Sequence, residues 1–386
     1  MIRTLKIRLL PTLEQEQAFW KHIWASRFIY NHMLAEQIRR REAGEKHMSA
    51  FDMSKLLTEM KQQDSYRWLL DVCARVLQRV CADLSEAYSN FFAHRTGFPK
   101  FKSKKKAKPA FPVADGIGAL WFSQTHVHIQ KIGKVAYQTD YGIPLGRECK
   151  FSNPRIQFIK ASGKWILTVG VECESQASVL TDKPMGIDVG IKDLAIVAFG
   201  DEKLVFHNIN KSRRIRTLER KQRHIQRVIS RKYRTNGNYE KTQQIQKYER
   251  ILRDIYFRLA NIRSDYTHKT THALVSMLPQ TVVMEDLNVS GMMKNRHLAK
   301  VIQDQRLCEF IRQMQYKCEE RGIEFVQVSR FYPSSKTCSN CGAIKRDLKL
   351  SERTFVCPEC GLHIDRDYNA ALNLMRYAGT SERLAA

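Results

Sequence analysis

The spacing of apolar residues divides the first half of the chain into strand-like and helix-like stretches. Apolar residues alternate with basic ones over residues 5–9, which predicts a strand that Pro11 ends. Over residues 13–93 the apolar positions recur every three or four residues and glycine is rare, which predicts a bundle of helices. Short alternating runs over residues 119–171 predict a small antiparallel β unit, which the N-terminal strand could join.

The second half begins after Pro184 with a different order of elements. It predicts three consecutive strands, two long helices separated at residues 236–238, a strand, a helix, a strand, a cysteine-rich module and a last helix. The strands are expected at 185–191, 194–200, 203–209, 281–286 and 323–329, and the later helices at about 304–321 and 368–377. This order is typical of an RNase H-like fold, whose mixed sheet carries acidic residues at its centre.

The apolar positions of the second long helix form one continuous seam. They step by three and four residues through Ile245, Tyr248, Leu252, Ile255, Leu259 and Ile262. Such a seam is more typical of a packed core than of a cofactor site.

The amino-acid composition indicates that this α/β protein has a binding partner. The 386 residues carry a formal net charge of +26, with 43% hydrophobic and 10% aromatic residues. That content is enough to build cores and excludes a chain that is mainly disordered, so the charge belongs to a folded protein of two to three domains. An excess of this size predicts a polyanionic partner. No apolar run approaches the roughly 20 residues needed to cross a bilayer, so we expect a soluble, non-secreted protein without a membrane partner.

Four of the ten cysteines are arranged as a metal site. Cys338 and Cys341 form one Cys-x-x-Cys pair, and Cys357 and Cys360 form another after fifteen intervening residues. Two such pairs can close one tetrahedral site of four sulfurs with no open position, which predicts a structural zinc ion. The other six cysteines are scattered and are interpreted as small buried apolar residues.

Acidic residues occur at three places where strands or helices meet loops. In Gly186-Ile187-Asp188-Val189-Gly190 the strand period sends Asp188 to the opposite face from its apolar neighbours. Glu285 ends a hydrophobic run, on the same face as Val283. Asp365 and Asp367 precede the last helix, where an aspartate is also a common N-cap. An exposed edge strand for Asp188 and a solvated strand end for Glu285 remain the simpler alternatives.

Three carboxylates from distant segments are the ligand set of a two-metal phosphodiesterase. Hard divalent cations prefer oxygen ligands and can clamp the attacking and leaving oxygens of an in-line displacement. We therefore expect two catalytic Mg²⁺ or Mn²⁺ ions.

Two basic segments are candidates for nucleic-acid contact. The segment 97–109 combines lysines with aromatic residues and prolines, which favours phosphate contact and base stacking over a plain solvated linker. Residues 211–254 hold 15 Lys or Arg against 4 Asp or Glu, on helices that also need an apolar stripe. A solvated charged face is the alternative for these helices. The nucleic-acid-binding candidates are Lys100, Lys102, Lys104, Lys105, Lys106, Lys108, Arg213, Arg214, Arg220, Arg223 and Arg227.

Several of these motifs together resemble one family. They are Gly97-Phe98-Pro99-Lys100-Phe101-Lys102, Gly186-Ile187-Asp188-Val189-Gly190, Glu285-Asp286-Leu287-Asn288-Val289, Ser334-Ser335-Lys336-Thr337-Cys338, and the run from Asp365 to Ala371. Over nearly its whole length the chain resembles TnpB, the transposon-encoded RNA-guided DNA endonuclease related to type V CRISPR effectors.

The resemblance implies a division into parts. Residues 1–11 and 114–180 would form a β wedge domain, 12–113 an inserted helical recognition lobe, 181–330 a RuvC-like nuclease, 331–364 a zinc ribbon that binds the target nucleic acid, and 365–386 the C-terminal helix and tail of the nuclease. It also implies the catalytic acids Asp188, Glu285 and Asp367, with Asp365 as the alternative third acid. Asp367 is preferred because the family places this acid two residues before the asparagine of Asn369-Ala370-Ala371.

The resemblance further implies a structured guide RNA derived from the transposon end. The guide would pair with double-stranded DNA next to a short transposon-adjacent motif, and the nuclease would cut the DNA. The protein would act as a monomer in a ribonucleoprotein, in the cytoplasm of a prokaryote and near its nucleoid. An RNA-guided regulator that binds DNA without cutting it, and a transposase that joins strands, are the competing functions.

Overall fold

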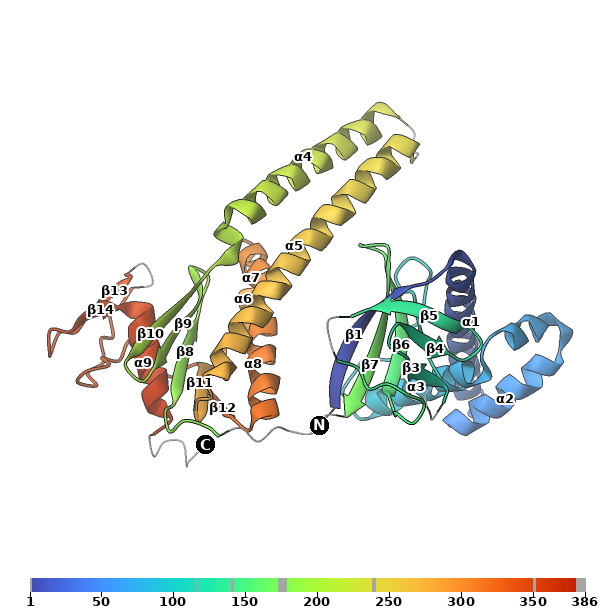
Figure 1. The fold of residues 1–386 in the computed structure, drawn as a ribbon, viewed down its shortest axis with the longest axis horizontal. Helices are drawn as coiled ribbons and strands as arrows, with labels where there is room; N and C mark the ends of the chain where they lie inside the picture. The colour runs from blue at the N-terminus through green and yellow to red at the C-terminus, as the bar shows by residue number, and fades with distance from the viewer. Residues whose placement is uncertain are drawn as a thin grey trace. The chain divides into compact units, whose positions relative to one another are not determined.

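The computed structural model describes residues 2–114, 116, 118–139, 142–172, 179–237, 241–349 and 352–379 (Figure 1). These residues fall into two units, 1–173 and 174–386. Unit 1 therefore contains both the helices and the β unit expected in the first half of the chain, and unit 2 contains the acidic and cysteine motifs. Cys173, one of the six scattered cysteines, lies outside the described residues.

Unit 1 is built on a seven-stranded sheet of order β2-β6-β7-β1-β5-β4-β3. The strands are β1 (Ile2–Leu10), β2 (Ala110–Pro112), β3 (Leu120–Phe122), β4 (His126–Ile129), β5 (Gly133–Gln138), β6 (Ser152–Ile159) and β7 (Lys164–Glu172). The predicted joining of the N-terminal strand to the β unit is confirmed, because β1 lies between β7 and β5 and is antiparallel to both. Its apolar residues Leu5, Ile7 and Leu9 are buried, as the alternation predicts.

The helices of unit 1 are α1 (Leu13–Glu42), α2 (Ala50–Gln62), the 3₁₀ turn η1 (Asp64–Asp71) and α3 (Ala74–Phe92). Thr12 and Ser49 begin α1 and α2 with capping boxes, in which side chain and backbone exchange hydrogen bonds. Phe19 of α1 packs into the sheet core, whereas Met33 of the same helix packs against α2 and α3. One long helix thus connects the sheet core with the helical core.

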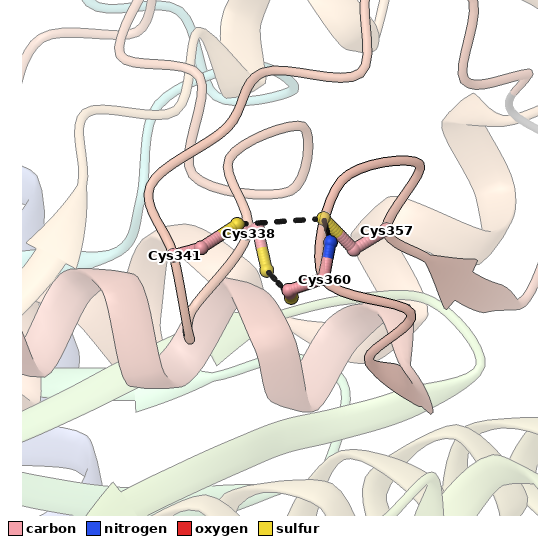
Figure 2. Close-up of side chains that lie close together, drawn as sticks. All are labelled: Cys338, Cys341, Cys357 and Cys360. Atoms are coloured by element: carbon pink, nitrogen blue, oxygen red, sulfur yellow. Dashed lines mark hydrogen bonds between the residues drawn. The ribbon is translucent and has the colours of Figure 1, made fainter.

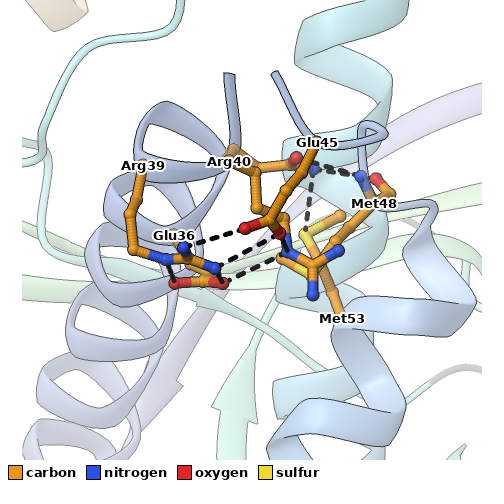
Figure 3. Close-up of polar contacts among 7 residues, drawn as sticks. Glu36, Arg39, Arg40, Glu45, Met48 and Met53 are labelled. Atoms are coloured by element: carbon orange, nitrogen blue, oxygen red, sulfur yellow. Dashed lines mark hydrogen bonds and ion pairs between the residues drawn. The ribbon is translucent and has the colours of Figure 1, made fainter. Parts of the chain in front are cut away.

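A compact network of ion pairs lies at the C-terminal end of α1 (Figure 3). Glu36 binds the guanidinium groups of Arg39 at 2.8 Å and Arg40 at 3.2 Å, and Arg39 also binds Glu45 at 3.0 Å. Hydrogen bonds from Arg39 hold the pKa of Glu36 down to about 2. Acidic side chains of the same unit neutralise the charges of these two arginines, so the arginines add little to the positive charge available to a partner.

Unit 2 is built on a five-stranded sheet of order β10-β9-β8-β11-β12. The strands are β8 (Met185–Val189), β9 (Asp193–Phe199), β10 (Glu202–His207), β11 (Thr281–Glu285) and β12 (Glu324–Val328). The central strand β8 is antiparallel to β9 and parallel to β11, and β11 is parallel to β12. The predicted mixed sheet with an acidic residue in its central strand is therefore present.

Helices cover both faces of this sheet. They are η2 (Ile209–Lys211), α4 (Arg213–Thr235), α5 (Gln243–Ser276), α6 (Val289–Met292), α7 (Ala299–Gln305), α8 (Leu307–Arg321) and α9 (Arg366–Tyr377). On one face Met185 and Ile187 pack with α5 and α8, and on the other face Ala198 and Val283 pack with α9. The helix expected at about 304–321 is α8, which begins at Leu307 because Arg306 adopts a left-handed backbone with φ of 59° and separates α8 from α7.

The long helices α4 and α5 form an antiparallel hairpin that extends from the sheet of unit 2 (Figure 1). Ile215 and Ile225 of α4 pack against Ile255 and Leu259 of α5. The apolar seam is thus a packed core, as predicted.

The cysteine module between β12 and α9 contains the short pair β13 (Thr354–Val356) and β14 (His363–Asp365). Among the described residues, no helix is both long and apolar enough to cross a membrane.

Candidate functional site

Asp188 lies in the central strand of unit 2, on the face that α9 covers. The strand period places Gly186 and Asp188 on that face and Ile187 on the opposite one, where it is fully buried. Withdrawal from water raises the pKa of Asp188 well above its usual range, and the charges of Glu285 and Asp367 raise this pKa further. The exposed edge strand considered as an alternative is excluded.

Glu285 ends β11 beside Asp188. The parallel register pairs Val282 with Met185, Val283 with Gly186 and Met284 with Ile187, so the next residues in each strand are Glu285 and Asp188. Opposite residues of paired strands point to the same face of a sheet. Withdrawal from water raises the pKa of Glu285, and a hydrogen bond that its carboxylate accepts from the Ser334 hydroxyl opposes this rise.

The two aspartates near the start of α9 have different contacts. The Asp365 carboxylate caps the helix, accepting hydrogen bonds from the backbone amides of Asp367 at 3.1 Å and Tyr368 at 3.0 Å. The Asp367 carboxylate lies 3.1 Å from the Arg366 guanidinium and raises the pKa of Asp188 more strongly than Asp365 does. The charge of Asp367 therefore acts on Asp188 more strongly than that of Asp365, whose carboxylate is engaged in the helix cap.

Gly186 allows α9 to lie directly on β8. A β-carbon at this position would overlap the backbone oxygen of Ala371 and the backbone nitrogen of Met375. A helix of the same chain therefore fills the space beside Gly186. This close packing places α9, whose first turn carries Asp367, against the strand that carries Asp188.

Asp286, the residue after Glu285, has a structural role. Its carboxylate forms an ion pair with Arg330 at 2.6 Å, and its backbone amide donates to the Val328 carbonyl at 2.9 Å. The contacts join the ends of β11 and β12.

The four predicted cysteines converge on one point (Figure 2). Their sulfurs all lie within 4.8 Å of one another, with Cys338 Sγ 3.6 Å from Cys360 Sγ and Cys341 Sγ 3.5 Å from Cys357 Sγ. Zinc bound tetrahedrally by thiolates at about 2.3 Å needs sulfurs about 3.8 Å apart. The donor set and its spacing therefore fit a structural zinc ion.

The two cysteine pairs have the same backbone geometry. In each pair a glycine with positive φ follows the second cysteine: Gly342 at 79° and Gly361 at 71°. The amide of Gly342 donates to the carbonyl of Cys338, and that of Gly361 to the carbonyl of Cys357. The repeated Cys-x-x-Cys-Gly sequence thus forms two equivalent turns. Among the described residues this is the one group of three or more His, Cys, Asp or Glu whose ligand atoms gather closely enough to hold a single ion, and Asp188, Glu285 and Asp367 do not form a second.

Two buried asparagines of α9 bind the segment that leads into the first cysteine pair. Asn369 Nδ2 donates to the Thr337 carbonyl at 2.7 Å, and Asn373 Nδ2 donates to the Ser334 carbonyl at 2.7 Å. In the sequence Asn369 is only a landmark, Ser334 belongs to a family motif without an assigned role, and Asn373 is not singled out. The one signal for Asn373 is its one-turn spacing from Asn369 inside an otherwise apolar helix face.

The lysines of segment 97–109 divide into two groups. Lys100, Lys104, Lys105, Lys106 and Lys108 are exposed on a loop without helix or strand. The Lys102 ammonium instead lies 3.5 Å from the centre of the Tyr30 ring, and Asn31 binds both the amide and the carbonyl of Lys102. Lys102 anchors the loop to α1, and the other five lysines face solvent.

The predicted arginines of α4 all face solvent. They are Arg213, Arg214, Arg220, Arg223 and Arg227. Arg223 and Arg227 line a shallow hollow together with Arg231 and Arg234. Arg263 of α5 is different, because it is bound by Glu219 at 3.0 Å and Asp304 at 2.8 Å. Along α4 the hairpin therefore carries a row of arginines that form no ion pair with an acidic side chain among the described residues.

Three protein-family models match the chain. The model described as "Probable transposase" of the IS605 OrfB type matches residues 168–296, and the "Cas12f1-like, TNB domain" matches residues 308–374, which include the cysteine module. A model described as "Helix-turn-helix domain" matches residues 1–46, where the structure has β1 and the single helix α1.

Curated relatives match over almost the full chain. A protein of Streptomyces pristinaespiralis named "Putative RNA-guided DNA endonuclease" is 31% identical over 97% of this chain and 88% of its own length. InsQ of Escherichia coli K12, with the same description, is 30% identical over 97% of this chain and 92% of its own length.

Solved structures share the fold at lower identity. A Cas12f1 complex with guide RNA and target DNA aligns with a TM-score of 0.53 and 15% identity, over 97% of this chain and 98% of that one. Mimivirus relatives that match part of the chain are named TnpB-like. On its full-length similarity to the curated proteins, the chain belongs to the TnpB family, which the IS605 OrfB model also describes, and it is related to Cas12f.

Proposed function

We propose that the protein is an RNA-guided DNA endonuclease and that unit 2 is its RuvC-like, RNase H-like nuclease. The observation that carries this proposal is the pairing of β8 with β11, which sets Asp188 beside Glu285, under a helix whose Asp367 acts on the Asp188 carboxyl group. Carboxylates brought together in a partly dehydrated place must either take up a proton or bind a cation, and divalent cations would offset the repulsion between them. The names of the full-length relatives support the same reaction.

The three carboxylates would hold two Mg²⁺ or Mn²⁺ ions. Their oxygens suit these hard cations, and Mg²⁺ commonly completes its coordination with water and substrate phosphate rather than with protein ligands alone. When bound, the two cations polarise the phosphodiester and stabilise the attacking and leaving oxygens. The fold of the chain would orient the carboxylates for these ions. The pairing of β8 with β11 fixes Asp188 and Glu285 side by side, and the helix cap at Asp365 fixes the start of α9 and so the position of Asp367.

The other parts would bind the nucleic acids. In this proposal residues 1–11 and 114–180 form the wedge domain, 12–113 the recognition lobe, 181–330 and 365–386 the nuclease, and 331–364 the zinc ribbon that contacts the target. The solvent-facing lysines of segment 97–109 and the arginine row of α4 lie along phosphates. Positive charge on these surfaces would hold the nucleic acid. The acidic centre, formed by Asp188, Glu285 and Asp367, would face the phosphodiester backbone of that nucleic acid.

The partners would be a structured guide RNA derived from the transposon end and a double-stranded DNA target beside a transposon-adjacent motif. Base pairing with the guide supplies most of the sequence specificity in such systems. The active species would be one protein bound to one RNA, acting in a prokaryotic cytoplasm.

The deciding experiment begins with the protein expressed beside its native flanking DNA. A discrete co-purified RNA that extends beyond the element, and guide-dependent cutting of DNA with Mg²⁺, are the expected results. Asp188→Ala should abolish cutting and leave RNA binding nearly unchanged. Guide-dependent DNA occupancy without strand breaks would instead identify the regulator, and strand-transfer products from transposon ends would identify a transposase.

A further inference from the structure

Ser334 joins the cysteine module to the acidic centre. This serine lies four residues before Cys338, its side chain is only 2% exposed, and its hydroxyl donates a hydrogen bond to Glu285 Oε1. The bond spans two segments that are 49 residues apart in sequence. Glu285 is the last residue of β11 and its backbone pairs with Val328 of β12, so the orientation of its side chain depends on side-chain contacts such as this one.

The position of Ser334 is itself fixed by α9. Asn373 Nδ2 binds the Ser334 carbonyl at 2.7 Å and the Thr337 carbonyl at 2.6 Å. Asn369 binds the Thr337 carbonyl at 2.7 Å and accepts a hydrogen bond from the Ser339 amide at 2.9 Å. Both asparagines are buried, so breaking these bonds would leave unsatisfied polar groups. The segment from Ser334 to Ser339 is thereby attached to the helix that carries Asp367.

We propose that Ser334 is a positioning residue that orients the Glu285 carboxylate for metal binding. A carboxylate that binds a cation through one oxygen is commonly held by a hydrogen bond at its other oxygen. The buried hydroxyl supplies this bond, and the closed cysteine module keeps the hydroxyl in place. This inference rests on the proposed nuclease function, because it gives Glu285 the role of a metal ligand.

The test compares three variants of the full ribonucleoprotein bound to target DNA. Ser334→Ala removes the hydroxyl, Ser334→Thr keeps it, and Ser335→Ala removes the neighbouring hydroxyl, which forms no hydrogen bond with Asp188, Glu285 or Asp367 among the described residues and serves as the matched control. The first readout is Mn²⁺ binding followed by electron paramagnetic resonance. The second is the Mg²⁺ concentration that gives half-maximal cutting. Zinc content and melting temperature report on the integrity of the module.

Ser334→Ala should weaken Mn²⁺ binding and raise the required Mg²⁺ by about 10- to 100-fold, the usual effect of losing a hydrogen bond to a metal ligand. Ser334→Thr should stay near the parent, and Ser335→Ala should match it. Zinc content should be unchanged in all three variants.

Three outcomes would overturn the inference. One is Mn²⁺ binding by Ser334→Ala equal to that of Ser335→Ala. Another is loss of zinc or a large fall in melting temperature that explains the defect of Ser334→Ala. The third is a parent complex that binds no Mn²⁺. A parent that binds Mn²⁺ but shows no guide-dependent cutting would refute the proposed function alone, because the metal-binding comparison would still decide the role of Ser334.

Discussion

Gly186 of β8 faces the backbone of Ala371 in α9 so closely that no methyl group fits between them. The contact fixes the distance between the central strand and the last helix, and hence between Asp188 and Asp367. The absence of a side chain at Gly186 thus sets the relative position of the carboxylates of Asp188 and Asp367.

Gly186→Ala should destabilise unit 2 by about 3 kcal/mol or more, because the helix backbone cannot yield as a flexible side chain would. Gly190→Ala is the matched control, since its β-carbon would meet only the Asp193 carbonyl at 3.4 Å, an ordinary contact. Chemical denaturation of both variants measures the difference. Equal stability of the two would mean that α9 is not packed on Gly186.

Asp188→Asn should stabilise the metal-free protein at neutral pH, and the gain should grow with pH. The folded pKa of Asp188 is raised, so the stability that its protonated form contributes is complete below the unfolded value of about 3.9 and is lost as pH rises through the folded value. A neutral amide avoids that loss. Melting temperatures measured across this pH range, without added Mg²⁺ and without chelators that would remove zinc, test the prediction. A constant difference at all pH values would contradict it.

Cys338→Ser should release the zinc ion and lower activity while leaving the carboxylates intact. Structural zinc sites contribute on the order of 10 kcal/mol to the folding of small modules. Cys308→Ser is the control, since Cys308 is exposed and lies outside the cluster. Metal analysis of the purified variants gives the answer, and one equivalent of zinc retained by Cys338→Ser would refute a four-sulfur site.

Changing Lys104, Lys105 and Lys106 together to alanine should weaken nucleic-acid binding and flatten its salt dependence. Each lost contact with a duplex phosphate lowers the log–log slope by roughly 0.9. Lys102→Met provides the contrast, because its ammonium lies over Tyr30 and its loss should cost about 0.5–1 kcal/mol of stability with little change in slope. Binding titrations at several salt concentrations separate the two effects. An unchanged slope in the triple variant would make the segment a linker.

Arg227→Ala and Arg263→Ala should separate binding from folding on the same hairpin. Arg227 faces solvent, so its loss should reduce nucleic-acid affinity and leave the melting temperature unchanged. Arg263 is only 14% exposed and pairs with Glu219 and Asp304, so its loss should destabilise unit 2 by about 2–3 kcal/mol. Calorimetry and binding measurements on both variants check this contrast, which a similar melting temperature for the two would refute.

Local patterns were enough to predict most of the fold. Alternation located β1 and β8, the period of α5 located its buried seam, and cysteine spacing located the metal cluster, since each of these signals lies within a short stretch of sequence. Element ends were less accurate: the helix expected from about residue 304 begins at Leu307, because the left-handed backbone of the single residue Arg306 leaves no mark on the hydrophobic period.

Contacts between distant segments were not predictable in this way. Nothing near Ser334 in sequence indicates that its hydroxyl meets Glu285, and nothing near Gly186 indicates which backbone lies against it. The role of Lys102 likewise depends on Tyr30, which lies on another element. Composition gives the charge of such residues, but only tertiary packing decides which of them remain available to a partner.

The docking of α9 also determines how truncated forms of the protein would behave. A polypeptide that stops before Arg366 keeps Asp188 and Glu285 but lacks Asp367, and it leaves Ile196, Ala198 and Val283 without their cover. Such a product would combine an incomplete acidic centre with an exposed apolar sheet face, which favours aggregation and degradation. The burial of this sheet face and the completeness of the set Asp188, Glu285 and Asp367 therefore depend on the same final helix.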